Sequence, residues 1–504
     1  MGGRLKICAT LNAERSNQST DSELRNNSKQ RASILVGLLW CVALLSVVVV
    51  GMLYTSRLDL LVVKNHGDLV QAHYLALAGI EKAKALLYQD AISRRQTSKN
   101  HTGELYSAPQ HFREVALGRG QFQVFRQGSR EEGGSVIYGI TDEESRLNVN
   151  TASNDELKKL YGMTPEVIAA IIDYRDDDNT VTPGGAEAEY YASLQPPYLP
   201  RNGPLLSVRE LLMVRGVSRE LLLGEDANQN GLLDPEEDDG DISNPPDNRD
   251  GILDSGWSGI MTVDSLVRNV NAAGQSRVNV QSADEPDLAA VPGVSAELAK
   301  AIVAGRGQNR LETLVDLLDV SAVVQQNAPN VEPQGRPQSP RSPNSSQGGP
   351  GRSGGASGFQ PAQIPGAPVQ QATGPKLVSE DLLMTIADDL TVAEERQQKG
   401  AININTASVA VLACLPRIEQ ELAQAIVSYR QSSGFFPNVA WLLKVPGMTR
   451  EIFKQVAPRV TARSETFRIL SEGKVKSSGA RKRIQVVVHI GSSTVETLSY
   501  REDL

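Results

Sequence analysis

The sequence has little cysteine, little histidine and no excess of basic residues. Three cysteines, at positions 8, 41 and 414, give no disulfide framework, and the five histidines have no metal-ligand spacing. A formal net charge of −8 lacks the basic footprint expected of a nucleic-acid-binding protein. No glycine-rich phosphate loop, nucleophile elbow or other catalytic set occurs, which favours a structural role over an enzyme. At 504 residues, the chain is too long for one ordinary domain.

One spaced pattern occurs three times in the same register. Its marker residues are Asn148, Gly162 and Arg175, then Asn279, Gly293 and Arg306, then Asn403, Arg417 and Arg430. Each copy predicts two short helices joined by a tight turn, in which glycine can take a positive φ. The third copy has Pro416-Arg417-Ile418 at the turn and no glycine. The pattern resembles the helix-hairpin-helix module, whose turns hold a phosphate in nucleic-acid-binding members and serve as packing units in others.

A long apolar run begins at Ser33. Residues 33–53 carry no charge and are numerous enough to cross a bilayer. The preceding segment is basic, which predicts a cytoplasmic N-terminus and an exported remainder. A secretory signal peptide is the alternative, but the run is longer than a typical signal core and no small-x-small cleavage site follows it. Residues 57–88 predict a helix that continues from the membrane to about Tyr88.

An acidic segment between residues 225 and 254 contains a pattern typical of a calcium loop. Its positions 1, 3, 5, 7, 9 and 12 are occupied by Asp226, Asn228, Asn230, Leu232, Asp234 and Glu237. Gly231 stands at position 6, where the loop turns sharply. A solvated acidic loop is the alternative reading. Glycine at position 6 and glutamate at position 12 favour structural calcium.

A second, less complete loop follows. Its positions 3, 5, 7 and 9 are occupied by Asn248, Asp250, Ile252 and Asp254. Pro246 and Trp257 fall at positions 1 and 12 and cannot supply the carboxylates needed there. The loop could bind a second ion by borrowing Asp238, Asp239 or Asp241, or it could be only a turn.

Alternating apolar and polar residues predict strands near both ends of the chain. They occur at 121–126, 466–470, 483–490 and 494–500, so one antiparallel sheet would take strands from both sides of the hairpin region. Residues 325–375 are rich in Pro, Gly, Ser and Gln and predict a disordered linker. Such a linker would separate the third hairpin domain from the second and let it move independently.

Taken with these features, two stretches resemble the minor pseudopilin K family of bacterial type II secretion. They are Tyr-Leu-Ala-Leu-Ala-Gly-Ile-Glu at 74–81 and Tyr-Gly-Ile-Thr-Asp-Glu-Glu-Ser-Arg-Leu-Asn-Val-Asn-Thr-Ala at 138–152. The resemblance implies an α+β fold: an N-terminal transmembrane helix continuing into a pilin-like helix-plus-sheet domain, interrupted by a mainly α-helical insertion of hairpin repeats. It also implies calcium binding.

The resemblance further implies a place in the cell and a set of partners. Prepilin peptidase would remove the leader, and the protein would cap a pseudopilus at the inner membrane with minor pseudopilins I and J to support cargo export. The candidate cut lies between Ala32 and Ser33, although prepilin leaders normally end in glycine. Gly37 stands where most pilins have glutamate, a substitution shared with the K family.

Two other functions fit parts of the sequence. One is a membrane-tethered DNA receptor of the uptake type, although the acidic balance makes nucleic acid an unlikely partner. The other is a calcium module released by signal cleavage. The predicted segments are leader 1–32, long helix 33–90, first strands 91–146, hairpin unit 147–224, calcium-loop insertion 225–275, hairpin unit 276–323, linker 324–376, hairpin unit 377–462 and last strands 463–504.

Overall fold

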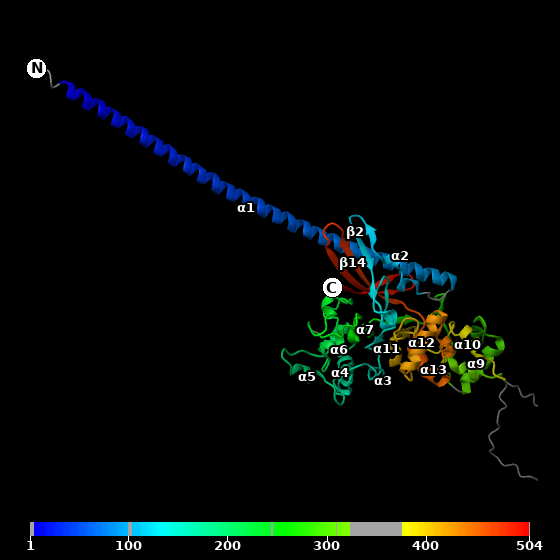
Figure 1. The fold of residues 1–504 in the computed structure, drawn as a ribbon. Coiled ribbons are helices and arrows are strands. Elements are labelled where there is room, and N and C mark those ends of the chain that lie inside the picture. Colours follow the sequence, from blue (N-terminus) through cyan, green and yellow to red (C-terminus); the bar gives the residue numbers. More distant parts are fainter. Residues whose placement is uncertain (1–4, 99–102, 243–244, 309, 323–374, 503–504) are drawn as a thin grey trace, which may run out of the picture.

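The fold consists of one very long helix, a six-stranded sheet and three hairpin units (Figure 1). The computed structural model describes residues 5–98, 103–242, 245–308, 310–322 and 375–502, with side chains described from residue 34 onward. Nearly all of the linker predicted at 324–376 lies outside the described residues, as do the side chains of the leader. The α+β fold class is confirmed.

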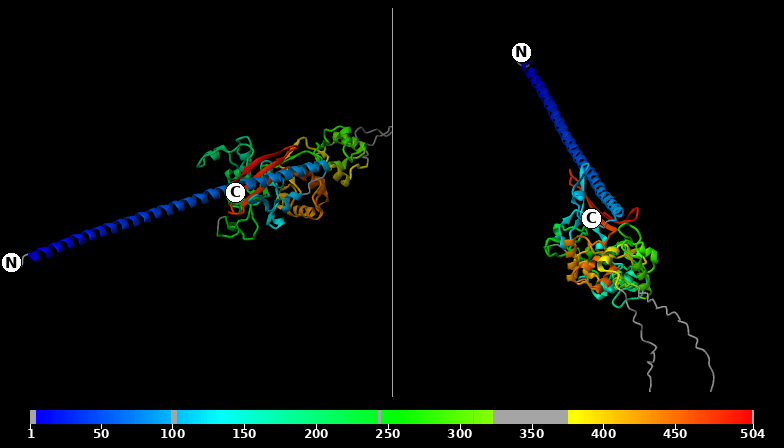
Figure 2. Two further views of the ribbon diagram at one scale, coloured as in Figure 1. Left: turned by 90° about the horizontal axis from the view of Figure 1, so that it is seen from above. Right: turned by 90° about the vertical axis from the view of Figure 1, so that its right-hand side faces the viewer.

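Helix α1 (Leu5–Thr97) begins earlier and ends later than the expected 33–88. It leaves the body of the molecule at one end, and residues 34–67 are exposed throughout (Figure 2). From Asp68 onward, one face is buried, including Ala76, Ile80 and Leu87. The helix extends past Tyr88 because no glycine or proline interrupts residues 89–97 and Ala91 is still buried against the body.

The sheet is antiparallel and lies against the packed part of α1. Its strands, in the order β1-β2-β14-β15-β16 with β5 also paired to β14, are β1 (Val115–Leu117), β2 (Gly120–Val124), β14 (Thr466–Val475), β15 (Arg481–Ile490), β16 (Val495–Arg501) and β5 (Thr141–Asp142). Helix and sheet approach closely at Gly473, where a Cβ atom would lie 2.0 Å from the Ala72 carbonyl oxygen. As predicted, the strands come from both sides of the hairpin region.

Each hairpin unit is closed by a pair of two-residue parallel strands. The pairs are β6 (Leu147–Asn148) with β7 (Met261–Thr262), β9 (Val278–Asn279) with β10 (Leu390–Thr391), and β12 (Ile402–Asn403) with β13 (Val460–Thr461). The repeated asparagine therefore lies in the first strand of every unit. Its Oδ1 atom accepts the amide two residues later in all three, at 2.8–2.9 Å.

Within a unit, two helical hairpins follow one another. Unit 1 contains α3 (Asn154–Leu157), α4 (Pro165–Arg175), α5 (Ala188–Ala192), η4 (Val208–Met213), α6 (Arg219–Leu223) and α7 (Gly256–Ile260). Unit 2 contains α8 (Glu285–Ala289), α9 (Ala296–Gln308), η6 (Leu314–Asp319) and α10 (Glu380–Ile386). Unit 3 contains α11 (Val409–Cys414), α12 (Gln420–Ser433), η7 (Val439–Lys444) and α13 (Arg450–Val456).

Smaller elements connect these parts. They are α2 (Pro109–Phe112), the hairpin of β3 (Arg126–Gln127) and β4 (Val136–Ile137), and the antiparallel pair of β8 (Leu266–Arg268) and β11 (Gln397–Lys399). The β8–β11 pair lies between units: β8 follows unit 1 and β11 precedes unit 3.

The predicted linker lies inside unit 2, which corrects the boundary placed at residue 376. Residues 320 and 377 come back together, with the Leu377 amide donating to the Val320 carbonyl at 3.0 Å. Helix α10 then covers the first turn of the same unit, since Ile386 lies 3.0 Å from where a Cβ on Gly293 would stand. The second unit needs both sides of the linker for its core. In the same way, unit 1 closes only at β7, after the acidic loops and not at residue 224.

Unit 3 lies between units 1 and 2 in space (Figure 1). Lys159 of unit 1 donates to the Leu415 carbonyl of unit 3 at 2.7 Å, and Lys454 of unit 3 pairs with Asp316 of unit 2 at 2.7 Å. One hydrophobic core runs through all three units. The expectation that unit 3 moves independently is therefore wrong, because two neighbours hold it.

Candidate functional site

The first acidic loop follows α6 and ends in the short helix η5 (Pro235–Glu237). Asp226 is 4% exposed, and its two carboxylate oxygens accept the amides of Asn230 at 3.0 Å and Gly231 at 3.1 Å. The Asn230 side-chain oxygen accepts the Leu232 amide at 2.7 Å. Gly231 has φ 70°, the turn conformation predicted for it. These bonds fold the loop around its own oxygen-bearing side chains.

The C-terminal half of this loop ends in a carboxylate without a full set of partners. The side-chain amides of Asn228 and Asn230 donate from Nδ2 to Asp234 Oδ2 at 2.8 and 2.6 Å. Glu237 is 4% exposed; its Oε2 accepts the Asp234 amide at 3.1 Å, whereas its Oε1 is buried with no hydrogen-bond partner. Burial raises the pKa of both Asp226 and Glu237. An orphaned buried carboxylate oxygen at position 12 fits a cation with hard oxygen ligands.

Leu232 connects this loop to the sheet. Its side chain is 8% exposed and packs in a small cluster with Phe125 and Leu470, which lie next to β2 and in β14. Leu232 therefore has both the backbone carbonyl expected at position 7 of the loop and an apolar side chain that packs on the sheet. Ordering the loop would therefore also order the contact between unit 1 and the sheet.

The second acidic loop is more open. Its Asn248 and Asp250 side chains accept the amides two residues later at 2.8 and 2.9 Å, and Asp238 accepts the Gly251 amide at 3.3 Å. Asp238, one of the three aspartates considered as borrowed ligands, therefore bonds to this loop through its carboxylate. Asp250 is already ion-paired with Arg130 at 3.1 Å. The predicted residues Ile252 and Asp254 follow; Ile252 is half-buried, and the Asp254 carboxylate accepts the Gly256 amide at 3.1 Å.

Glu225 joins the two loops and was not predicted as a site residue. It is 8% exposed, and its carboxylate accepts the amides of Asn248 at 3.3 Å and Asp254 at 3.0 Å. Asp247, also unpredicted, accepts the amide of Asp239 at 2.8 Å. The position of Glu225 directly before loop position 1 was the available signal in the sequence.

A second group of carboxylates lies where the hairpin units meet the sheet. Asp142 is 3% exposed and accepts hydrogen bonds from the side chains of Asn403 (2.9 Å), Thr406 and Ser464. The fully buried Glu143 accepts from Arg468 Nε in β14 at 2.6 Å. These residues belong to the stretch that carries the family resemblance, but no local sequence pattern indicates their partners.

Glu144 completes this junction. It is fully buried and accepts the backbone amides of Leu266 at 3.3 Å and Thr466 at 3.2 Å. Burial raises the pKa of Glu144 well above its usual value and, less strongly, raises that of Asp142. Burial is the largest single effect on Glu143 and opposes its ionisation, but the charges of Arg468 and Arg146 and the hydrogen bonds from Thr262 and Arg468 together lower the Glu143 pKa. Three neighbouring carboxyls thus connect unit 1, unit 3 and the sheet.

The hairpin turns are used for internal packing. A Cβ on Gly162 would lie 2.4 Å from Leu221 of the following hairpin, so a side chain already covers this turn. The glycine-less third turn keeps the same backbone shape, with Arg417 at φ 60°. Lys159 donates to the Ile418 carbonyl of that turn at 2.9 Å. These contacts fit the packing role of such modules.

The repeated arginine also has an internal role. Arg306 donates to the carbonyls of Val280 at 3.1 Å and Ala283 at 2.7 Å, and Arg430 donates to Ile404 at 2.9 Å. Arg175 makes the corresponding contact with Ala152 at 2.7 Å. Each arginine thus holds the end of its long helix against the segment after the unit's first strand.

The apolar segment of α1 is exposed. Within the described part of the chain, one helix, Ile34–Thr97, is long and apolar enough to cross a membrane, and its most apolar stretch is not buried. The candidate cut between Ala32 and Ser33 falls on continuous helical backbone of α1. Such a helix is compatible with a single-pass membrane anchor.

Comparisons with known proteins agree with the resemblance. The family model described as type II secretion system (T2SS), protein K, first domain, matches residues 145–223. In this segment the chain is similar to the type II secretion system protein K family, that of the minor pseudopilin K. The helix-hairpin-helix motif model matches residues 274–334 and 397–461, in agreement with the hairpin units 2 and 3.

Individual relatives cover the chain in part. Type II secretion system protein K of Klebsiella pneumoniae is 28% identical over 215 residues, which is 39% of this chain and 60% of that protein. Transcriptional accessory protein Tex of Neisseria gonorrhoeae is 39% identical over 66 residues, 13% of this chain and 9% of Tex. A crystal structure of the GspK–GspI–GspJ complex from enterotoxigenic Escherichia coli aligns over 86% of this chain and 97% of that chain, with 12% identity and a TM-score of 0.40.

Proposed function

We propose that this protein assembles at the tip of a type II secretion pseudopilus with minor pseudopilins I and J and supports protein export across the outer membrane. The observation that carries the proposal is the division of α1 into an exposed apolar half and a half packed on the sheet. Residues 34–53 give about 30 Å of apolar helix, the thickness of a bilayer core. The same helix would anchor the chain and join the pseudopilus.

The orientation follows from the charge distribution. The basic leader would stay in the cytoplasm, so the sheet and hairpin units would lie in the periplasm. Beyond the membrane segment, α1 still exposes Leu58, Leu61 and Val62. We propose that these side chains pack against the helices of neighbouring pseudopilins once prepilin peptidase has cut between Ala32 and Ser33.

Calcium would have a structural role in this protein. The donor set of the first loop consists of oxygens alone, and Glu237 Oε1 is buried without a partner, as a cation ligand would be before binding. We propose that Asp226, Asn228, Asn230, Asp234, Glu237 and the Leu232 carbonyl hold one Ca²⁺. Because Leu232 packs on the sheet, the ion would stiffen the joint between unit 1 and the pilin-like domain.

The test expresses the full chain in a strain from which its gene has been deleted and which keeps the rest of the secretion system. Leu61→Glu places a charge on the exposed apolar face of α1, whereas Lys64→Glu changes charge at an exposed polar position of the same helix. We expect Leu61→Glu to abolish co-purification with pseudopilins I and J and to reduce cargo in the medium, and Lys64→Glu to change neither. Normal secretion in the strain lacking the chain would refute the proposal.

The N-terminus of the mature protein provides an independent readout. Mass spectrometry of protein from native membranes should find a start at Ser33. An intact leader together with normal co-purification would refute the processing step alone. A start beyond residue 53 would mean a released protein, and the assembly role would fail with it.

A further inference from the structure

The C-terminal end of α1 lies over the hairpin units (Figure 1). A small cavity is bounded there by the last turns of α1, by residues 267–274 and by residues 463–465, with Ile490 of β15 beside them. About 30 Å³ of this cavity is open to the centres of water molecules, whereas one water needs about 10–15 Å³. The cavity therefore has room for a small ion but not for a nucleotide or a peptide.

Arginines dominate the lining of this cavity. They are Arg94 and Arg95 from α1, Arg268 from β8, and Arg463 from the segment after β13. Among the described residues that line the cavity, Glu465 is the only acidic one. The cavity thus gathers positive charge from parts of the chain that are far apart in the sequence.

The carboxylates close to these arginines are already engaged. Glu465 accepts hydrogen bonds from Arg268 Nε at 2.9 and 3.0 Å. Asp388, behind the lining, pairs with Arg463 and is shared with Arg277, whose Nη2 atom lies 3.4 Å away. One carboxylate therefore serves two buried guanidinium groups.

Arg95 bonds to carbonyls and to no carboxylate of the described residues. Its Nη2 atom donates to the Gly491 carbonyl at 2.8 Å and its Nη1 atom to that of Ser492. A Cβ atom on Gly274 would lie 3.2 Å from Arg95 Cδ, so the neighbouring hairpin holds the side chain in place. Burial lowers the pKa of Arg95, and the charge of Arg268 lowers it further. Because arginine keeps its proton in proteins, these like charges remain close together.

The end of the helix explains part of this charge. Cations suit the C-terminal end of a helix, where Arg94 and Arg95 stand in the last turns. Arg94 also has a partner of its own, since its Nε atom lies 2.9 Å from Asp90 Oδ2. Arg268 and Arg463 come from outside the helix, so the helix dipole does not account for them.

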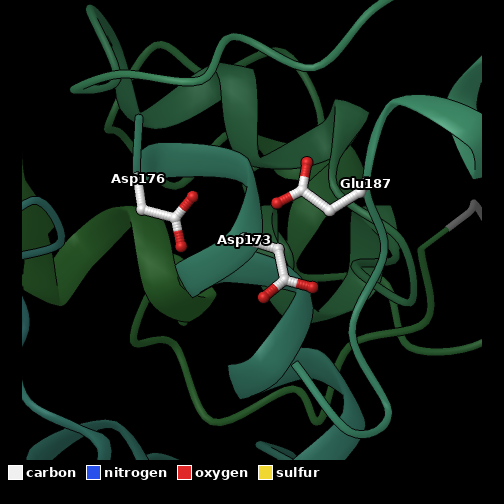
Figure 3. A group of neighbouring side chains, drawn as sticks. All are labelled: Asp173, Asp176 and Glu187. Atoms are coloured by element: carbon white, nitrogen blue, oxygen red, sulfur yellow. The ribbon is translucent and has the colours of Figure 1, made fainter. Parts of the chain in front are cut away.

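The charge of the cavity is opposite to that of the whole chain, whose formal net charge is −8. Acidic clusters lie in unit 1 instead: the two acidic loops, and Asp173, Asp176 and Glu187, which come together beside α4 (Figure 3). None of these carboxylates lines the cavity. A cleft lined by one sign of charge concentrates ions of the other sign.

We propose that this cavity binds one small oxyanion of the phosphate and sulfate class, with Arg95 as its main ligand and Arg94 and Arg268 beside it. Guanidinium groups form strong, charge-assisted hydrogen bonds with such oxyanions. Each guanidinium also has several N–H donors in a fixed fork, which a tetrahedral ion can meet from different sides.

The bound ion would be a free ion and not a lipid headgroup. At the usual helical rise, Arg95 lies about 60 Å along α1 from Leu53, the end of the apolar segment. The ion would fasten the end of α1 to residues 267–274 and 463–465. It would therefore strengthen the connection between the pilin-like domain and the hairpin units.

Equilibrium dialysis of the full chain in detergent against radiolabelled inorganic phosphate tests the proposal. Chloride keeps the ionic strength constant, because salt also screens the arginines from one another. We expect one bound phosphate per parent chain, and Arg95→Gln should weaken binding at least about tenfold. The matched control is Arg119→Gln, an exposed arginine between β1 and β2, which should bind as the parent does.

The opposite results would overturn the proposal. They are no bound phosphate on the parent chain at millimolar concentration, unchanged affinity in Arg95→Gln, or an equal loss in Arg119→Gln. Sulfate should displace the phosphate, whereas acetate at the same concentration should not. Equal displacement by acetate would assign the cavity to carboxylates and overturn the choice of ligand.

A second readout locates the ion. Phosphate should slow amide exchange in residues 270–276 of the parent chain, and Arg95→Gln should abolish this protection. If Arg95→Gln fails to fold, Arg94→Gln removes a different lining arginine and should weaken phosphate binding in the same direction. Co-purification with pseudopilins I and J reports on the assembly role separately, so the two proposals can fail independently.

Discussion

Asn403 Nδ2 donates a hydrogen bond to Asp142 Oδ2 over 2.9 Å and so connects unit 3 with the strand that precedes unit 1. The corresponding asparagines of the other units bond to residues just after the closing strand of their own unit. Asn148 donates to Ser265 Oγ at 3.0 Å, and Asn279 donates to the Ala393 carbonyl at 3.1 Å. The repeat therefore uses the same residue to close each unit, and in unit 3 the residue also reaches the sheet domain.

Removing the Asp142 carboxylate should uncouple the hairpin units from the sheet. Asp142→Ala leaves the donors of Asn403, Thr406 and Ser464 without their buried acceptor. We expect a loss of about 3 kcal/mol in the free energy of unfolding, since a buried unsatisfied group costs about 1–3 kcal/mol. Denaturant titration followed by circular dichroism measures the change.

Asp155→Ala is the matched control for this prediction. Asp155 has a side chain 87% exposed and makes one surface ion pair with Lys158 at 3.1 Å. Surface pairs contribute about 0–1 kcal/mol, so the control should lose far less stability. Equal losses for the two variants would contradict the role assigned to the junction.

The junction should also make stability depend on pH. Burial raises the folded-state pKa of Glu144 above its unfolded value. The folded state then holds the proton more tightly, so this contribution to stability is complete below the unfolded pKa and is lost as pH rises through the folded pKa. Glu143, whose pKa is lowered, acts in the opposite direction.

Glu144→Gln isolates this effect because it keeps an oxygen that can accept the Thr466 amide but cannot ionise. We expect the variant to gain stability over the parent protein as pH is raised from about 5 to about 8. Parallel urea titrations at several pH values measure the difference. A constant difference between the two proteins across this range would show that Glu144 has the same pKa in both states.

Local signals made much of the hairpin fold predictable. Ser153 forms a capping box with Glu156, and Thr164 caps α4; such caps depend only on residues three apart in the sequence. The junction was not predictable: Asp142 and Asn403 are 261 positions apart, and no local pattern records that contact.

The position of the linker shows a second limit of the sequence. Ser379 caps α10, with its side chain accepting the Leu382 amide at 3.2 Å. A cap indicates where a helix begins but not which core it joins. The deciding contact is that of Ile386 with the turn at Gly293, between residues on opposite sides of the linker.

Arg417 should be a strained residue in the third turn. Its φ of 60° lies in the left-handed region, which costs a residue with a Cβ atom about 1–2 kcal/mol. Arg417→Gly relieves this strain but adds freedom to the unfolded chain, so we expect a net gain of about 0.5 kcal/mol. Arg417→Ala keeps the Cβ atom and should not stabilise. Thermal unfolding of both variants distinguishes relief of strain from loss of the arginine side chain.

Calcium should raise the stability of the protein through Glu237. If the first loop binds Ca²⁺ in the folded state alone, saturation to about 100 times the dissociation constant should add about 2.7 kcal/mol. Glu237→Gln removes the carboxylate whose Oε1 is buried without a partner, so most of this increment should disappear. Glu220→Gln changes an exposed glutamate in the neighbouring helix α6 and should retain it. Melting curves with Ca²⁺ and with chelator measure the increment. An increment that survives in Glu237→Gln would place the responsible ion elsewhere in the chain.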